Sequence, residues 1–344
     1  MDTSNGPDDV VWDVTYACPL RCTHCYSESG RRPSRQLGHQ DMLRVSDAII
    51  SLRPKMVSLA GGEPLIVRGI FEIAERISQA GIAVVVYTGG WTLRQDMLDE
   101  RIDPLRGIAV SLDGATARTH DRIRGRAGSF DRALNALGLL DRAAAERAAR
   151  GAKPVKFGLE TVVVRSNFDH LPEICATIAP RFPRLSLITF GACVPTGLAT
   201  REGFAEHELL TDEQVARLAD PEYAGWLQSK APSSVEVSTT DNHLEMLHPD
   251  HVRDGIAPLT LVVEPDGEVR GMPTYEGTVG NLLDEPAYVL WERSVARWTD
   301  PFVTETLEPV RTMAQWAAAA RRIDYHFGSA EVQARIDRRP AFAG

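Results

Sequence analysis

Short apolar segments alternate with longer amphipathic segments over the first two hundred residues of the chain. Segments rich in β-branched and other apolar residues predict six strands, over residues 10–14, 56–59, 83–87, 107–111, 157–164 and 185–190. Apolar residues at three- and four-residue steps predict helices over residues 39–52, 69–80, 129–150 and 171–179. This alternation predicts a parallel α/β sheet wrapped by helices, either open and doubly wound or closed into a complete or partial barrel.

The pattern changes after about residue 200. A polar helix is predicted over residues 211–218, and a Pro- and Ser-rich stretch follows at residues 231–234. Residues 259–263 and 268–269 flank a Pro-Asp-Gly sequence, which predicts a β-hairpin, and the Ala- and Arg-rich tail over residues 309–338 predicts helices. We therefore expect two units, a core over residues 8–200 and a small α+β cap over residues 201–344.

Composition and charge narrow the classes of partner. With 344 residues, of which 43% are hydrophobic, the chain is long enough for a large α/β domain with an appendage. A net charge of −9 argues against nucleic acid as a main partner, because phosphate contacts need clustered Lys and Arg. No apolar run reaches the length of a membrane span, so we expect no membrane partner.

Three cysteines, Cys18, Cys22 and Cys25, follow the first predicted strand. Thiolates are the usual ligands of iron–sulfur clusters, and three of them would leave one iron of a four-iron cluster open for a substrate or cofactor. A zinc knuckle and a disulfide framework are the alternatives. Zinc sites are normally closed by four ligands, and the spacing of His24 would strain such a site. The chain has 5 cysteines and no signal peptide, which does not fit a secreted domain held by disulfides. Reduced thiols and an oxygen-labile cluster predict a cytoplasmic protein.

The spacing of these cysteines resembles the signature of the radical S-adenosyl-L-methionine (radical SAM) superfamily. A second motif, Gly61-Gly62-Glu63-Pro64, follows the second predicted strand, as in that family. The resemblance implies a partial (β/α)6 barrel over residues 8–200 and a 4Fe-4S cluster on Cys18, Cys22 and Cys25. It also implies that the open iron chelates the amino and carboxylate groups of SAM, while Gly61, Gly62 and Glu63 contact the amino group.

Further SAM contacts are implied by the same resemblance. Thr88 closes the third strand before two glycines, where relatives carry Thr-Asn-Gly. Ser111 is expected at the ribose or carboxylate of SAM, and Arg124 at the carboxylate, with a surface salt bridge as the alternative for Arg124. Three residues are expected beside the adenine ring: His24, Tyr26 and Val163.

The C-terminal third resembles the SPASM/twitch extension of radical SAM enzymes, in which a hairpin carries cysteines for auxiliary clusters. This chain has no cysteine after Cys193, so the resemblance implies a cap without auxiliary iron–sulfur clusters and favours redox-neutral outcomes such as epimerisation, elimination, decarboxylation or carbon–carbon bond formation. Cys193 is a candidate hydrogen-atom donor to a substrate radical, with a packed thiol as the alternative, whereas Cys175 lies in an apolar helical pattern and is expected in the core.

The resemblance predicts an enzyme in which a 5′-deoxyadenosyl radical abstracts hydrogen from the substrate, with flavodoxin or ferredoxin as electron donor. Only about ten residues precede the first strand, so we expect a small molecule (a sugar, nucleoside or amino-acid derivative) rather than a peptide bound by a leader-recognition domain. Two alternatives stay open: a maturase whose peptide is delivered by a separate protein, and a non-catalytic metal-binding scaffold. Candidate substrate contacts in the cap are Asp241, His243, His248, Tyr275 and Glu276.

Overall fold

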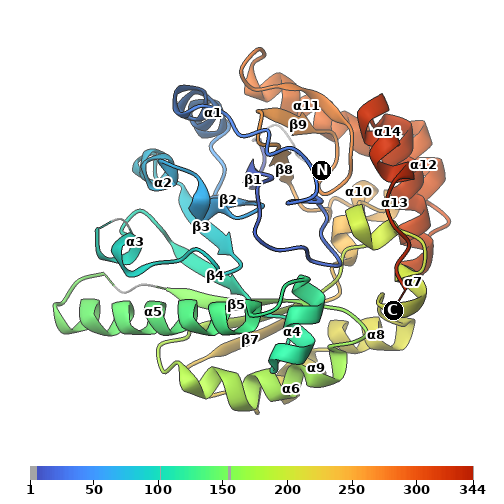
Figure 1. The fold of residues 1–344 in the computed structure, drawn as a ribbon. Coiled ribbons are helices and arrows are strands. Elements are labelled where there is room, and N and C mark those ends of the chain that lie inside the picture. The colour runs from blue at the N-terminus through green and yellow to red at the C-terminus, as the bar shows by residue number, and fades with distance from the viewer. Residues whose placement is uncertain (1–5, 101, 154–155, 344) are drawn as a thin grey trace.

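Parallel strands paired in chain order form the framework of the molecule (Figure 1). The computed structural model describes residues 6–100, 102–153 and 156–343. Its parallel strands are β1 (Asp9–Thr15), β2 (Met56–Gly61), β3 (Ala83–Thr88), β4 (Gly107–Ser111), β5 (Phe157–Val163), β6 (Leu187–Ala192) and β7 (Glu236–Thr240). The first six strands were predicted, and they confirm the α/β class and the partial barrel. β7 was not predicted, because Val237 is the one apolar residue among its five.

Helices cover the outside of these strands, and the side chains of the strands alternate between the two faces. On β1, Val10, Trp12 and Val14 are buried in the helix-covered core, whereas the alternate side chains face the inside of the barrel. The helices of this layer are α1 (His39–Ser51), α2 (Ile70–Gln79), α3 (Gln95–Glu100), α4 (Ala117–Arg124), α5 (Ser129–Ala149) and α6 (Leu171–Glu173).

The predicted helix at residues 171–179 is irregular. α6 is followed by a π-helical turn over Ile174–Ile178 and a 3-10 turn over Ala179–Arg181. Pro180 has no amide hydrogen to donate to the preceding turn, which explains why a regular α-helix does not continue to this point.

The chain after residue 200 adds strands at the other edge of the same sheet. β8 (Thr260–Val263) pairs in parallel with β1, and β9 (Glu268–Arg270) and β10 (Thr278–Asn281) follow in antiparallel order. The predicted hairpin around Pro265-Asp266-Gly267 is therefore confirmed. Because the sheet runs on through β7 and β8, the domain boundary at residue 200 remains a prediction.

The connection over residues 241–259 joins β7 to β8, which are the first and last parallel strands of the sheet. Asn242 donates a hydrogen bond to the carbonyl of Ala192 at 2.7 Å, and the Tyr275 hydroxyl donates to the carbonyl of Met246 at 3.1 Å. These bonds fix the connection to β6 on one side and to the cap on the other. The connection contains η6 (His243–Met246) and α10 (Pro249–Arg253).

The chain after residue 200 supplies most of the remaining helices. On the side of the molecule that is orange and red in Figure 1 lie α11 (Ala287–Trp298), α12 (Pro301–Leu307), α13 (Met313–Phe327) and α14 (Ala330–Asp337). The others include η1 (Pro64–Ile66), α7 (Phe204–His207), α8 (Asp212–Ala219) and α9 (Pro221–Gln228). Within the described residues, no helix has the length and apolar character that a membrane span requires.

A buried ionic network joins the cap to the segment that follows the cysteines. We define it by seven side chains: Glu28, Arg32, Glu264, Arg270, Glu276, Arg335 and Arg339. The Glu28 carboxylate accepts from Arg335 at 3.0 Å and from Arg339 at 2.7 Å, and Arg270 donates to Glu264 at 3.1 Å. Arg270 is 0% exposed, so its charge depends on these partners.

Replacement of Arg270 by Met should lower the free energy of unfolding by about 3 kcal/mol, because it leaves the buried Glu264 carboxylate with weaker partners. Arg253→Met is the matched control, since Arg253 pairs with Asp250 on the surface and its side chain is 64% exposed; its effect should stay below about 1 kcal/mol. Urea unfolding of the two variants measures both values. Equal effects would show that the network does not stabilise the cap.

Candidate active site

The loop with Cys18, Cys22 and Cys25 leaves the carboxyl end of β1 and is held by the backbone of neighbouring elements. The amides of Arg21 and Thr23 donate to the carbonyls of Arg124 and Ile123, at 3.0 and 2.8 Å. These carbonyls belong to the last turn of α4, where a helix has no acceptor partners of its own. The loop is thereby fixed to the helix that follows β4.

Each of the three sulfur atoms has a polar group beside it. The amide of Leu20 donates to Cys18 Sγ at 3.4 Å, Arg124 Nη1 lies 3.8 Å from Cys22 Sγ, and Ser27 Oγ lies 3.6 Å from Cys25 Sγ. Burial raises the pKa of Cys22 to about 11 and that of Cys18 to about 12. Hydrogen bonds to sulfur favour thiolate and metal-bound sulfur over the neutral thiol.

The glycine turn after β2 packs directly against the start of the cysteine loop. The amide of Gly62 donates to the carbonyl of Thr15 at 2.6 Å, and the amide of Glu63 donates to that of Ala17 at 3.0 Å. A Cβ atom on Gly62 would lie 2.2 Å from the Ala17 carbonyl oxygen, and Gly61 has φ of +101°. Glycine is therefore required at both positions.

The Glu63 carboxylate is buried beneath this turn and well bonded. It accepts from the Thr88 hydroxyl at 2.8 Å and from the amides of Leu65 and Gly89, at 3.2 and 3.1 Å. Burial nevertheless raises its pKa to about 7. A cation beside this carboxylate would stabilise the charged form.

Asp113, at the end of β4, ties the surrounding elements together. Its carboxylate pairs with Arg124 (Nη2 at 2.9 Å) and His24 (Nε2 at 3.3 Å) and accepts from the amide of Val162 at 3.1 Å. Burial favours the neutral acid, but the charge of Arg124 and the bond from His24 outweigh it and hold the pKa of Asp113 below its usual range. The backbone amide of Asp113 also donates to His120 Nδ1 at 3.1 Å.

A cavity of about 460 Å³ extends from the cysteine loop into the barrel. Its walls include the cysteines, the glycine turn and the inward side chains of β1 to β5 and β8. The residues predicted as site residues that line it are Cys18, Cys22, Cys25, His24, Tyr26, Gly61, Gly62, Glu63, Thr88, Ser111 and Arg124. The structure thus brings eleven of these residues to one cavity.

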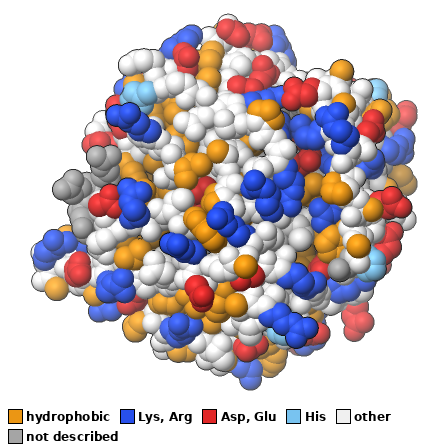
Figure 2. All heavy atoms as spheres, viewed as in Figure 1, with side chains coloured by type: hydrophobic (Ala, Val, Ile, Leu, Met, Phe, Trp, Pro, Cys, Tyr) orange, Lys and Arg blue, Asp and Glu red, His pale blue; other side chains and the backbone are white. Residues whose placement is uncertain are grey.

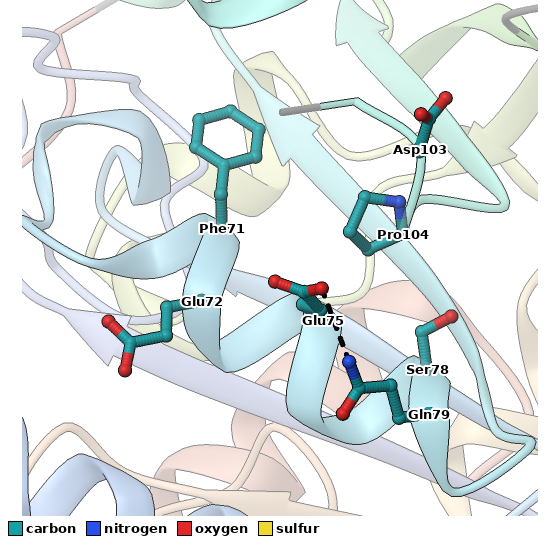
Figure 3. A pocket seen from close by; sticks show the side chains of 7 residues that line it. All are labelled: Phe71, Glu72, Glu75, Ser78, Gln79, Asp103 and Pro104. Atoms are coloured by element: carbon teal, nitrogen blue, oxygen red, sulfur yellow. Dashed lines mark hydrogen bonds between the residues drawn. The ribbon is translucent and has the colours of Figure 1, made fainter. Parts of the chain in front are cut away.

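A second hollow, of about 630 Å³, lies on the outer helix layer (Figure 3). Residues of α2 and the segment before β4 line it, and Gln79 donates to Glu75 at 3.2 Å across one of its walls. It contains none of the cysteines and lies away from the carboxyl ends of the strands. We therefore assign the chemistry to the cavity inside the barrel.

Two of the site residues predicted in the barrel domain lie outside this cavity. Val163 faces the helix side of β5, because strand alternation brings Glu160 and Val162 to the cavity instead. Cys193 is 1% exposed, and its thiol donates to the carbonyl of Val194 at 3.6 Å. This burial favours the packed-thiol alternative for Cys193, and its role as hydrogen donor stays a prediction.

The assignment of Arg124 also changes. Its side chain is buried rather than on the surface, and its guanidinium is engaged by Asp113 and lies beside Cys22. The surface salt bridge is therefore wrong. A contact between Arg124 and the carboxylate of SAM would compete with Asp113 for the guanidinium nitrogen atoms of Arg124.

The cap candidates do not line the cavity. Tyr275 is held between Trp316 Nε1, which donates to its hydroxyl at 2.7 Å, and the Met246 carbonyl, and Glu276 belongs to the buried ionic network. His243 pairs with Asp241 at 2.9 Å. His248 Nε2 accepts a hydrogen bond from Arg311 Nη1 at 3.2 Å. These side chains therefore have structural partners instead of a place in the cavity.

Sequence reasoning missed several cavity residues, among them Tyr87, Glu160 and Glu245. Tyr87 and Glu160 follow from strand alternation once the inner face of each strand is known. The Glu160 carboxylate faces the cavity without a hydrogen-bond partner among the described residues, and burial raises its pKa to about 7. No local sequence signal identifies Glu245, which lies in the connection between β7 and β8.

Comparison with protein families gives one match over the barrel. The Radical SAM superfamily matches residues 12–175. The chain is 30% identical over 302 residues to the mycofactocin maturase MftC of Mycobacterium tuberculosis. This alignment covers 84% of this chain and 71% of MftC. It is 34% identical over 172 residues to the AdoMet-dependent heme synthase of Methanosarcina barkeri, where the match spans 49% of this chain and 46% of the relative.

Solved structures share the fold. SuiB of Streptococcus suis bound to S-adenosylmethionine aligns with a TM-score of 0.64 at 14% identity, over 86% of this chain and 67% of SuiB. The protein anSMEcpe with bound AdoMet aligns with a TM-score of 0.61 at 15% identity, over 96% of this chain and 99% of that one. At these identities the likeness concerns the fold.

The unpaired carboxyl of Glu160 should make stability depend on pH. Its pKa rises from 4.5 in the unfolded chain to about 7 in the folded protein. The folded state therefore binds this proton more tightly, and the associated stability is complete below about pH 4.5 and lost as the pH rises through about 7. Glu160→Gln, which stays neutral, should unfold with a free energy higher than wild type by on the order of 3 kcal/mol at about pH 8.5, and with no gain at about pH 4.5.

Urea unfolding of the metal-free protein at the two pH values measures this difference. Glu292→Gln, which removes an exposed carboxylate on α11, is the control and should show no gain at either pH. If Glu160→Gln raises the free energy of unfolding equally at both pH values, the raised pKa of Glu160 is not the cause of the difference.

Proposed function

Because this chain belongs to the radical SAM superfamily, in its SPASM/twitch branch, we propose that Cys18, Cys22 and Cys25 hold the 4Fe-4S cluster with which it cleaves SAM. The observation that carries this proposal is the meeting of three thiols, each with a polar partner, and the glycine turn at one end of a single cavity.

The donor set fits the cluster better than it fits a single ion. A structural zinc site is normally closed by four Cys or His ligands. A four-iron cluster takes one thiolate for each of three irons and leaves the fourth iron open. Arg124 brings a positive charge to Cys22, which favours the anionic cluster in a buried loop.

The cofactors supply a 5′-deoxyadenosyl radical, which abstracts a hydrogen atom from the substrate. The side chains and backbone of the protein position SAM in the cavity. Glu63, held by Thr88 and by backbone amides, presents a carboxylate for the ammonium group of SAM, and the glycine turn allows close approach of the backbone. Ser111 presents a hydroxyl to the same cavity, while His24 and Tyr26 form the wall beside the cysteines.

We propose a small biosynthetic intermediate as the substrate, with a redox-neutral outcome. The chain has no cysteine beyond Cys193 for an auxiliary cluster, so an electron left on the product must return to the one cluster or stay in the substrate. A cavity of about 460 Å³ is within the size range of small-molecule sites.

A peptide is the second candidate substrate. The relative that covers 84% of this chain is a mycofactocin maturase, and SuiB has been solved with its precursor peptide SuiA. In that case the cavity would receive one side chain of the peptide. Incubation with peptide and small-molecule candidates, followed by mass spectrometry of the products, separates the two classes.

An electron donor such as flavodoxin or ferredoxin would dock over the cysteine loop. Arg21, Arg31 and Arg126 are exposed there and donate to loop carbonyls, with Arg126 Nη1 at 2.6 Å from the Pro19 oxygen. Arg126 and Arg132 lie over the Trp91 ring, at 3.8 and 5.3 Å from its centroid.

None of these four arginines forms an ion pair with a described residue. Figure 2 shows Lys and Arg side chains gathered over the loop that leaves β1, in the middle of that face. On a chain with a net charge of −9, this basic surface favours an acidic partner close to the cluster.

The cluster assignment predicts that Cys22→Ala abolishes 5′-deoxyadenosine formation. Protein reconstituted with iron and sulfide under anaerobic conditions, then given SAM and dithionite, should form 5′-deoxyadenosine in the wild type. Cys175→Ala, which removes a buried thiol in the helical layer, should keep this activity and the iron content. Liquid chromatography and iron analysis measure both quantities. The absence of 5′-deoxyadenosine from fully loaded wild type would instead favour the non-catalytic scaffold.

The basic surface predicts a selective effect of Arg132→Glu. This variant should raise the KM for reduced flavodoxin by roughly 3- to 10-fold and leave the rate with dithionite unchanged, because only the protein donor has to dock. Arg142→Glu, on an exposed position of the same helix ten residues further along, is the control. Equal effects of the two substitutions would place the docking site elsewhere.

A further inference from the structure

The inner end of the cavity is formed by Asp9, Thr260 and Glu245. Asp9 begins β1 and pairs in register with Thr260, the first residue of β8, so these two side chains are neighbours on the inner face of the sheet. Glu245 comes from the connection between β7 and β8. This end lies opposite the cysteine loop, which follows the last residue of β1.

The side chains of Asp9, Glu245 and Thr260 have no hydrogen-bond partner among the described residues, and Thr260 is only 9% exposed. Burial, and then the charge of Asp9, raises the pKa of Glu245. Burial of carboxylates without a counter-charge costs free energy, which a bound cation would recover.

The neighbouring charges do not supply that cation. The charge of Lys55 acts on Asp9, but Lys55 bonds to Asp8 at 2.8 Å and its side chain is 78% exposed to solvent. Arg124 lines the opposite end of the cavity and is paired with Asp113. The other acidic lining residues, Glu63 and Glu160, add negative charge. Among the described residues, no Lys or Arg forms an ion pair with Asp9 or Glu245, and Arg124 is the one Lys or Arg residue that lines the cavity.

We propose that the inner end of the cavity binds a cationic group of the substrate, a primary ammonium or a guanidinium, between the carboxylates of Glu245 and Asp9. The Thr260 hydroxyl is a further acceptor for such a group, which has several N–H donors to satisfy. The inference rests on the proposed function, because it assigns the substrate of the same cavity.

The length of β1 sets the shape of this substrate. Its seven residues rise by about 20 Å from Asp9 to the start of the cysteine loop. The cationic group therefore lies many bonds away from the carbon that loses its hydrogen atom, which is near the cysteine end. An elongated amine fits this arrangement, whether it is a free amino-acid derivative or a basic side chain of a peptide. A neutral sugar or nucleoside leaves the two carboxylates unpaired.

The test compares two probes of equal length, hexylammonium and hexan-1-ol, on the reconstituted holoenzyme with SAM. Isothermal titration calorimetry should give at least tenfold tighter binding of hexylammonium to the wild type. Glu245→Gln should lower the affinity for hexylammonium to that for the alcohol, whereas Glu292→Gln, an exposed control, should keep the preference. Asp9→Asn should reduce the preference for hexylammonium over hexan-1-ol.

Two outcomes overturn the proposal: equal affinity of the wild type for the two probes, or full preference for the cation in Glu245→Gln. The same preparations are assayed for 5′-deoxyadenosine. If the wild type shows no cation preference but still cleaves SAM, only this inference is contradicted. A cation preference in protein that forms no 5′-deoxyadenosine supports the cationic site and contradicts the proposed reaction.

Discussion

The buried carboxylate of Asp113 is the contact on which the geometry at the cysteine loop depends. It fixes Arg124 from α4 and His24 from the loop, and it accepts the amide of Val162 from β5. The Arg124 charge keeps Asp113 ionised in the interior, and Asp113 in turn holds the guanidinium beside Cys22 Sγ. Neither charge would be stable at this depth without the other, so the loop, the helix and two strands are positioned together.

The inner and outer faces of the strands serve different purposes. Outward side chains such as Val10, Trp12 and Val14 are fully packed and stabilise the sheet. Inward side chains such as Glu160 remain polar and unpaired, and they cost stability. Such unpaired polar groups lower the stability of the fold but can bind a ligand, a combination that is common at functional sites.

Much of the barrel could be predicted because most of its strands are rich in β-branched and other apolar residues and because its glycine and cysteine motifs are local. β7 could not, since one apolar residue gives no periodic signal. Val163 was assigned to the cavity in place of Val162, because alternation defines two rows of side chains but only the curvature of the sheet decides which row faces inward. Glu245 reaches the cavity through a tertiary arrangement of β7, β8 and their connection.

The buried ionic network holds the cap to the segment behind the cysteine loop without a metal ligand. The network ties Glu28, close behind the last loop cysteine, to Arg335 and Arg339 near the end of the chain. These ties involve no iron, and the cap has no cysteine with which to bind any. The contacts that hold the segment behind the cysteine loop to the end of the chain therefore do not depend on a bound cluster.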